Sequence, residues 1–228
     1  MKKLLSILFI GSICLANITQ QDILDRLSKE NISNVDFIFT DLDSGMRSVT
    51  IPQKHVKNAL AEGLKFDGSS IPGFSQIFES DMHLEADLNS FRILSSLAYG
   101  QKTAAVVCNV KRSEAQAYEG DPRTFLVNIC NKFKELGYTL LCGPEIEFYL
   151  FDKAELDDKS LVVVDGNKYF DSLTSQKLKE MSESMINALG ESGIDTEKIH
   201  HEVAAGQYEM SLKYAPAVQL ADNIVLAK

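Results

Sequence analysis

The stretch GPEIEFYLF, Gly143 to Phe151, places two acidic residues in an otherwise apolar segment. Successive side chains of a strand point to opposite faces, so Glu145 and Glu147 would share one face. The opposite face then carries three apolar residues suited to a core, Ile146, Phe148 and Leu150. A single Glu-x-Glu pair most often faces solvent on a half-exposed strand. Further acidic residues elsewhere in the chain suggest a second interpretation.

Those residues belong to the motif IHHEVAAGQYEM, Ile199 to Met210. The Ala-Ala-Gly between Glu202 and Glu209 allows the chain to turn, so both carboxylates can point to one place. Together with the two acids of the first motif they would repel one another unless they had a partner. A divalent cation removes that conflict, and oxygen ligands suit Mg²⁺ or Mn²⁺, while His200 and His201 leave zinc open. The residues alone therefore leave two interpretations open, a candidate metal site and acids that simply face solvent.

The composition is that of an ordinary globular protein, with 228 residues, 45% of them hydrophobic and 24% charged. A net charge of −9 argues against binding to nucleic-acid phosphates, which depends on basic patches. The four cysteines show no CxxC pair or other metal-ligand spacing. We interpret the three in apolar segments as small buried hydrophobic residues, Cys108, Cys130 and Cys142.

The N-terminus, MKKLLSILFIGSICLAN, differs in character from the rest of the chain. Two lysines precede an apolar run from Leu4 to Ala16 that is short for a membrane span and typical of a secretory signal. A start codon assigned too far upstream is the alternative, and we prefer it. Residues 1–17 are therefore a signal-like leader or a mis-assigned start.

The first half of the chain is rich in predicted strands. Thr19 is placed to cap a helix over Gln20–Lys29, and residues 35–52 form two strand-like runs around an Asp-Ser-Gly turn, which predicts a hairpin. A stretch rich in glycine and serine interrupts the regular pattern over residues 65–84, and another strand is expected over residues 104–110.

A break follows at YEGDPR, where Asp121 and Pro122 suit the cap and first turn of a helix. Helices and strands alternate after it, which favours an α+β protein with a domain boundary near residues 113 to 121. The expected domains span residues 18–113 and 120–228. The elements expected in the second are a helix over 124–136, a strand over 138–151, a strand over 161–164 and a helix over 174–189.

Three motifs in this order resemble glutamine synthetase of the bacterial type I class. They are FDGSSIPGFSQIFESDMHL at residues 66–84, GPEIEFYLF at 143–151 and HHEVAAGQYEM at 200–210. Shorter segments agree with the resemblance, namely FTDLDSGMRSVTIP, YFDSL and ADNIVLAK. The seven-residue step from Glu202 to Glu209 looks like the alpha subgroup. The resemblance covers roughly residues 18 to 228.

The resemblance implies a small N-terminal β-grasp domain, followed by a catalytic α/β domain whose curved antiparallel sheet holds two metal ions, Mg²⁺ or Mn²⁺. By match to the family motifs, Glu147, Glu202 and Glu209 would bind one ion. Glu145 would belong to the second ion. Family members are about twice as long, so the catalytic domain is expected to be truncated at Lys228, without the other ligands of the second ion.

Further residues match family positions around the substrates. Asp67 would act in the active site of a neighbouring subunit and take a proton from ammonium, with Ser70 close by. Glu197 matches a position that contacts ATP. The implied reaction is the ATP-dependent amidation of glutamate through γ-glutamyl phosphate, and the implied assembly is a homo-oligomer of twelve subunits in two stacked rings.

The length of the chain and its signal-like leader lead to further expectations about its activity and its location. We expect this chain to be inactive as a ligase by itself, and we expect a cytoplasmic location, with export as the alternative if the leader is genuine. A γ-glutamyl-polyamine ligase would share the metal motifs and differ in its substrate loops. A non-catalytic remnant with a role in assembly is the alternative from a different class.

Overall fold

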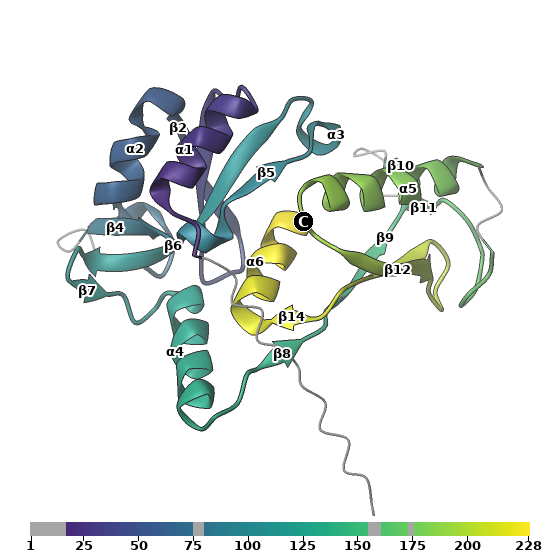
Figure 1. The fold of residues 1–228 in the computed structure, drawn as a ribbon. Coiled ribbons are helices and arrows are strands. Elements are labelled where there is room, and N and C mark those ends of the chain that lie inside the picture. Colours follow the sequence, from purple (N-terminus) through teal and green to yellow (C-terminus); the bar gives the residue numbers. More distant parts are fainter. Residues whose placement is uncertain (1–16, 75–79, 155–160, 173–175) are drawn as a thin grey trace, which may run out of the picture.

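The structure is a computed structural model that describes residues 17–74, 80–154, 161–172 and 176–228. The leader expected over residues 1–17 lies outside the described residues except for Asn17. Figure 1 shows a β-grasp part that holds the long strands of the first half, and a second part built from the later strands and helices. Helix α6 lies between the two parts (Figure 1).

The β-grasp part contains a mixed sheet with the strand order β2-β1-β6-β4-β3, and β5 and β7 also pair with β6. Strands β1 and β6 are parallel, whereas the other pairs are antiparallel. The strands are β1 Asn34–Thr40, β2 Met46–Pro52, β3 Leu64–Asp67, β4 Asp81–Ala86, β5 Arg92–Leu94, β6 Thr103–Ser113 and β7 Gln116–Ala117.

Strands β1 and β2 form the predicted hairpin. The Asp41 carboxylate accepts hydrogen bonds from the backbone N–H groups of Asp43 (3.0 Å) and Gly45 (2.7 Å), which closes the turn. Ser44 takes a left-handed backbone conformation with φ of 64°. The hairpin is thus specified by turn residues that lie next to one another in the chain.

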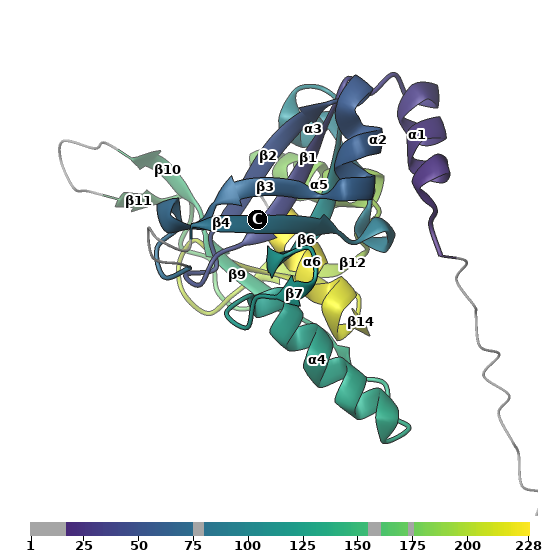
Figure 2. The ribbon, with the colours of Figure 1, turned by 90° about the vertical axis from the view of Figure 1, so that its left-hand side faces the viewer.

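Two helices, α1 Gln20–Lys29 and α2 Gln53–Glu62, cover one face of this sheet (Figure 2). The Thr19 side chain accepts a hydrogen bond from the Asp22 N–H, and the Asp22 carboxylate accepts one from the Thr19 N–H, so the predicted cap of α1 is confirmed. Helix α2 was not predicted; it directly follows Pro52 and has no side-chain cap.

The prediction of an irregular stretch over residues 65–84 was wrong at both ends. Leu64–Asp67 and Asp81–Ala86 are strands that pair with each other, with Asp67 opposite Asp81. Of the described part, the turn-like composition produces only the short 3₁₀ helix η1, Gly68–Ser70, and the bends that follow it. The error arises because strand pairing across the connection outweighs local composition.

The other helices within the described residues are α3 Ser96–Tyr99, α4 Pro122–Glu135, α5 Gln176–Glu191 and α6 Ala217–Ala227, with a further 3₁₀ helix, η3, at Leu88–Ser90. Helix α4 confirms the predicted start, because the Asp121 carboxylate accepts a hydrogen bond from the Thr124 N–H at 2.9 Å. The same carboxylate accepts one from the Val110 N–H of β6. The cap therefore also joins α4 to the β-grasp sheet.

The single strand expected over residues 138–151 is instead divided among three partners. The pieces are β8 Leu141–Cys142, β9 Glu145–Tyr149 and β10 Phe151–Ala154, which pair with β14 Ala215–Pro216, β13 Gln207–Leu212 and β11 Leu161–Val163. Pro144 lacks an N–H group and separates β8 from β9. Strand β12, Thr196–His201, completes an antiparallel sheet in the order β12-β13-β9.

A second core joins the two parts of the molecule. Ile38 and Ala105 on the other face of the β-grasp sheet belong to the same cluster of buried residues as Leu189 of α5, Met210 of β13 and Leu226 of α6. Ile146 and Phe148 pack against this cluster, as predicted for the apolar face of their strand. The carboxylate-bearing sheet therefore rests on a shared core.

A buried arginine links α4, α6 and the β-grasp part. The Arg123 guanidinium donates to both carboxylate oxygens of Asp222, at 2.9 and 2.8 Å, and also to Asp87 at 2.7 Å and Asn109 at 2.6 Å. Although burial alone lowers the pKa of Arg123, the hydrogen bonds and charge of Asp222 and Asp87 raise it above its ordinary value. Arg123 therefore stays charged in this network.

Candidate metal centre

The acidic motifs meet on one face of the β12-β13-β9 sheet. Glu209 of the central strand lies opposite Glu147 of β9 and His200 of β12, so these three residues form one row across the sheet. In the adjacent row, Ser211 lies between Glu145 and Lys198.

Three side chains come together closely enough to bind one metal ion. One potential ligand atom each of His200, Glu202 and Glu209 lies within 4.8 Å of the others, and this is the one such group found in the described ranges. All three side chains are largely shielded, with exposed fractions of 10%, 14% and 8%. Two carboxylates and one imidazole are suitable ligands for Mn²⁺ or Zn²⁺, and the carboxylates also suit Mg²⁺.

The turn between β12 and β13 brings Glu202 to Glu209, as the Ala-Ala-Gly sequence indicated. Gly206 has a φ of 68°, and a side chain at this position would approach Val163 Cβ within 2.8 Å. Glycine is therefore required by both the backbone conformation and the space. The Glu202 carboxylate accepts a hydrogen bond of 3.0 Å from the Val203 N–H, which holds it at the end of the hairpin.

The Glu209 carboxylate has two further partners. Ser211 donates a hydrogen bond of 2.8 Å to it, and the Lys198 ammonium lies 3.2 Å away. Although burial raises the pKa of Glu209, these contacts hold it below its ordinary value. The carboxylate is therefore ionised near neutral pH, as a metal ligand must be.

The two acids of β9 lie beside this group rather than in it. Glu147 is exposed, and its carboxylate accepts a hydrogen bond of 2.7 Å from the Gln207 side chain. Glu145 is also exposed and lies opposite Ser211. The assignment of Glu147, Glu202 and Glu209 to one ion remains a prediction, and the structure adds His200 beside Glu202 and Glu209.

Two aromatic rings shield His200 from one side. Phe170 and Tyr169 stack on each other, and both meet the His200 ring edge-on, with centroid distances of 4.6 and 5.6 Å. Phe170 has a φ of 60°, which is unusual for a residue with a bulky side chain. The backbone N–H of Phe170 donates to the His201 carbonyl, which attaches this segment to β12.

A buried network lies on the other face of the hairpin. The His201 ring, which is fully buried, bridges the Asp165 carboxylate (2.7 Å) and the Glu202 carbonyl (2.5 Å). Tyr208 donates a hydrogen bond of 2.5 Å to the second oxygen of Asp165. Although burial raises the pKa of Asp165, the hydrogen bonds from Tyr208 and His201 hold it below its ordinary value. Asp165 thus ties both strands of the hairpin together behind Glu202.

Neither Asp165 nor Lys198 was predicted as a site residue, and His200 entered only as an argument for zinc. A lone aspartate 36 residues before His201 gives no recognisable spacing. Lys198, in contrast, gives a recognisable signal, because it lies two residues before His200, and side chains two residues apart share one face wherever the segment is a strand.

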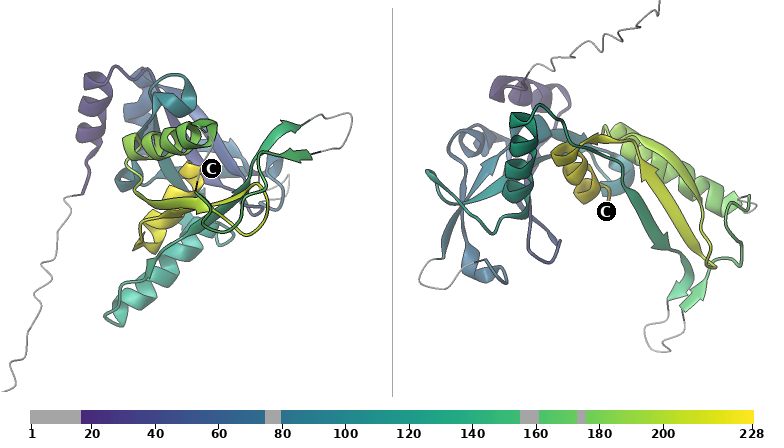
Figure 3. Two further views of the ribbon diagram at one scale, coloured as in Figure 1. Left: turned by 90° about the vertical axis from the view of Figure 1, so that its right-hand side faces the viewer. Right: turned by 90° about the horizontal axis from the view of Figure 1, so that it is seen from below.

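Asp67 forms a separate polar cluster at the end of β3. Its carboxylate accepts hydrogen bonds from the Ser69 hydroxyl (2.6 Å), the Ser70 hydroxyl (2.8 Å) and the Ser69 N–H (2.9 Å). The bond from the Ser69 hydroxyl contributes most to lowering the pKa of Asp67. Figure 3 (right) shows the blue strands of the β-grasp sheet on one side of the molecule and the yellow-green β12–β13 hairpin on the other. Because β3 ends at Asp67 and pairs with β4 in the β-grasp sheet, the Asp67 cluster and the metal-binding group belong to different parts of the chain.

Glu197 lies at an irregularity of β12. The pairing register shifts between Thr196 and Lys198, which leaves Glu197 without a partner residue on β13, and its side chain is exposed. A β-bulge of this kind changes the direction of neighbouring side chains. Here it aligns Lys198 with Ser211.

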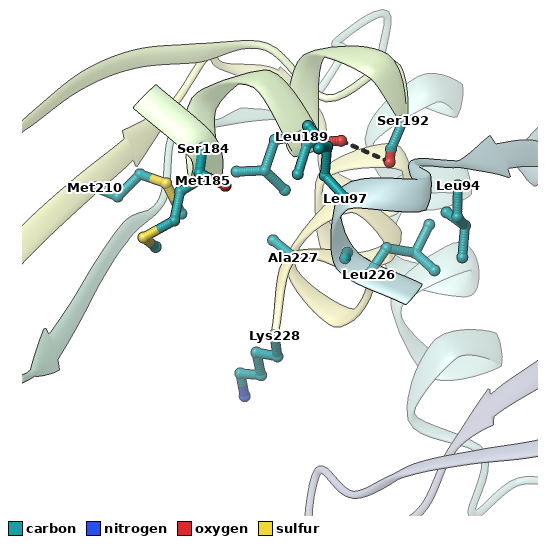
Figure 4. Close-up of a pocket in the computed structure, with 12 residues that line it drawn as sticks. Leu94, Leu97, Ser184, Met185, Leu189, Ser192, Met210, Leu226, Ala227 and Lys228 are labelled. Carbon is teal, nitrogen blue, oxygen red and sulfur yellow. Dashed lines mark hydrogen bonds between the residues drawn. The ribbon is translucent and has the colours of Figure 1, made fainter. Parts of the chain in front are cut away.

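A pocket of about 390 Å³ lies between α3, α5 and α6 (Figure 4). Its walls include Leu97, Met185, Leu189 and Leu226, and Met210 reaches it from the core side of β13. The metal-binding group lies on the opposite face of that strand. The pocket is therefore distinct from the metal centre.

No helix within the described ranges has both the length and the apolar character needed to cross a membrane.

Comparison with known families gives matches along most of the chain. Residues 31–113 match the family model described as glutamine synthetase, beta-Grasp domain, and residues 119–228 match glutamine synthetase, catalytic domain. A glutamine synthetase of Clostridium saccharobutylicum is 37% identical over 214 residues, which cover 94% of this chain and 48% of the relative. One from Thermus thermophilus is 38% identical, covering 92% and 48%. The chain thus spans about half the length of these relatives.

Solved structures agree in fold. A glutamine synthetase of Plasmodium falciparum superposes with a TM-score of 0.76 and 25% identity, covering 92% of this chain and 47% of the other. The structure described as GmaS/ADP complex has a TM-score of 0.78 and 20% identity, covering 90% and 47%. These matches confirm the predicted order of a β-grasp domain followed by glutamine synthetase catalytic-domain sequence. The proposed boundary near residues 113 to 121 remains a prediction.

Proposed function

Because the chain belongs to the glutamine synthetase family, we propose that it contributes to the ATP-dependent amidation of glutamate by ammonium. The observation that carries this proposal is the convergence of His200, Glu202 and Glu209 within 4.8 Å on a hairpin of the catalytic-domain match. The chain would supply the β-grasp domain and the first part of the metal centre. The need for ATP favours the cytoplasm.

The residues of this face fit a divalent cation, with Mg²⁺ or Mn²⁺ held by Glu202 and Glu209 together with His200 or Glu147. When bound, such a cation offsets the repulsion between the glutamate carboxylate and the phosphates of ATP and stabilises the transferring phosphoryl group. Glu145, one row further along the sheet, would face a second ion, and exposed Glu197 would contact ATP.

Asp67 is proposed to remove a proton from ammonium, which is not a nucleophile until it is deprotonated. The hydroxyl groups of Ser69 and Ser70 keep its carboxylate ionised for this role. Since Asp67 belongs to the β-grasp sheet and the metal-binding group to the β12–β13 hairpin in the other part of the molecule (Figure 3), this residue would serve the site of a neighbouring subunit. The proposed activity therefore includes a homo-oligomer, in agreement with the twelve-subunit assembly implied by the family resemblance.

Binding of Mn²⁺ tests the metal centre directly. Titration of the 228-residue chain with MnCl₂, followed by the electron paramagnetic resonance signal of free Mn²⁺, should show a site that is lost in Glu209→Gln and weakened in Glu202→Gln. Glu183→Gln, at an exposed position of α5, is the matched control and should bind as the unchanged chain does. Equal binding by all four proteins would contradict the proposed site.

The reaction needs a second test, because the chain spans about half of its relatives. We expect no phosphate release from ATP by this chain alone. Addition of a polypeptide corresponding to the remaining half of the Clostridium saccharobutylicum relative should give phosphate release that depends on both glutamate and ammonium. That polypeptide alone and the mixture with Asp67→Asn serve as controls. Release supported by another amine but not by ammonium would instead favour the polyamine-type ligase.

A further inference from the structure

The positively charged side chain of Lys198 already contacts the metal-binding group. The Lys198 Nζ lies 3.2 Å from Glu209 Oε1 and 3.5 Å from His200 Nε2. His200 Nε2 itself lies 3.4 Å from the same Glu209 oxygen. The ammonium therefore lies against two of the three side chains that would bind a divalent cation.

The fold places the lysine there through a specific irregularity. The bulge at Glu197 brings Lys198 into register with Ser211, on the face of the sheet that also carries Glu209. The hydrogen bond with Glu209 contributes most to raising the pKa of Lys198, and the charge of Glu145 adds to it.

We propose that Lys198 is a tethered cation that competes with a divalent cation for Glu209 and thereby sets the metal affinity of this site. This inference rests on the proposed metal centre. Glu202 and Glu209 carry two negative charges, and Lys198 neutralises one of them. A divalent cation that binds both carboxylates must displace the ammonium or tolerate its repulsion.

The Lys198 side chain is free to move away from Glu209. The side chain of Lys198 is 48% exposed, and its four-carbon stem is flexible. Glu145, in the same row of the sheet, is the next carboxylate that attracts it. Metal binding would therefore exchange the Lys198–Glu209 pair for a Lys198–Glu145 pair.

The test compares Mn²⁺ affinity among charge variants. Lys198→Met keeps most of the stem and removes the charge, and it should bind Mn²⁺ about tenfold more tightly than the unchanged chain, as measured by the resonance signal of free Mn²⁺. Lys198→Arg keeps the charge and should bind within about twofold of the unchanged chain. Lys213→Met is the matched control, because it removes a lysine that follows β13 and pairs with Asp195 at 3.8 Å.

Thermal unfolding gives a second readout. Without metal, Lys198→Met should unfold at a lower temperature, because Glu202 and Glu209 lose their neutralising charge, and added Mn²⁺ should raise its unfolding temperature more than that of the unchanged chain. Equal or weaker Mn²⁺ binding by Lys198→Met would overturn the role of Lys198 alone. Absence of Mn²⁺ binding in both the unchanged chain and Lys198→Met would overturn the metal centre itself.

Discussion

The β-grasp sheet and the smaller β12-β13-β9 sheet differ in how they use their two faces. In the β-grasp sheet, β1 and β6 bury side chains on both faces, with Phe37 and Val106 in one core and Ile38 and Ala105 in the other. In the second sheet, β9 packs only one face against a core and exposes its acids on the other. The β-grasp sheet contributes most of the buried apolar side chains. The second sheet packs one face on a core and so holds like charges near one another on its other face.

The largest effect should come from opening the β-grasp core. Phe37→Ala removes a fully buried ring and should lower the free energy of unfolding by about 3–5 kcal/mol. Phe148→Ala, at a partly buried position of β9, should cost clearly less. Urea unfolding followed by circular dichroism measures both, and equal losses would contradict the comparison.

The next largest effect should come from the link between the parts. Arg123→Ala leaves Asp222 buried without its partner and should cost about 3 kcal/mol of unfolding free energy. Lys102→Ala, which removes an exposed ion pair with Glu30, is the control and should cost less than about 1 kcal/mol. A similar small cost for both variants would show that the Arg123 network does not hold the parts together.

Replacement of Asp165 should separate stability from metal binding. Asp165→Asn weakens the support behind Glu202 and should lower Mn²⁺ affinity about tenfold, as expected for a residue that orients a ligand from behind. Asp121→Asn is the control, because it disturbs a buried helix cap at a cost of about 1 kcal/mol and should leave Mn²⁺ affinity unchanged. Equal Mn²⁺ affinity in both variants would limit Asp165 to a structural role.

The smallest effect concerns acid stability of the β1–β2 turn. The hydrogen bond from the Gly45 N–H contributes most to lowering the pKa of Asp41 below its ordinary 3.8, with further help from Arg47. A lowered pKa in the folded state stabilises the protein above about pH 4, and this contribution is lost as the pH falls through the folded-state pKa. The difference in stability between the unchanged chain and Asp41→Asn should therefore shrink on going from pH 6 to pH 2.5 in urea unfolding. A constant difference would contradict this assignment.

Elements with local signals were predicted well. The cap of α1 by Thr19, the turn at Asp41 to Gly45 and the start of α4 at Asp121 each depend on residues within a few positions of one another. These local hydrogen bonds do not depend on how the rest of the chain is packed. Helix α2 and strands β3 and β4 lack such signals and depend on packing and pairing.

The candidate site likewise has one part that local sequence predicts and another that depends on strand pairing. The sequence alone specified the alternation that puts Glu145 and Glu147 on one face, and the glycine turn that returns Glu209 to Glu202. Which acids meet, and with which partners, depended on the register of β12 and β13 within their hairpin and on the pairing of β13 with β9, which lies far earlier in the chain. That register aligned His200 with Glu209, and the bulge at Glu197 brought Lys198 beside them. Strand register is set by the hydrophobic pattern on the buried face, so the positions of the charged residues follow from the core beneath them.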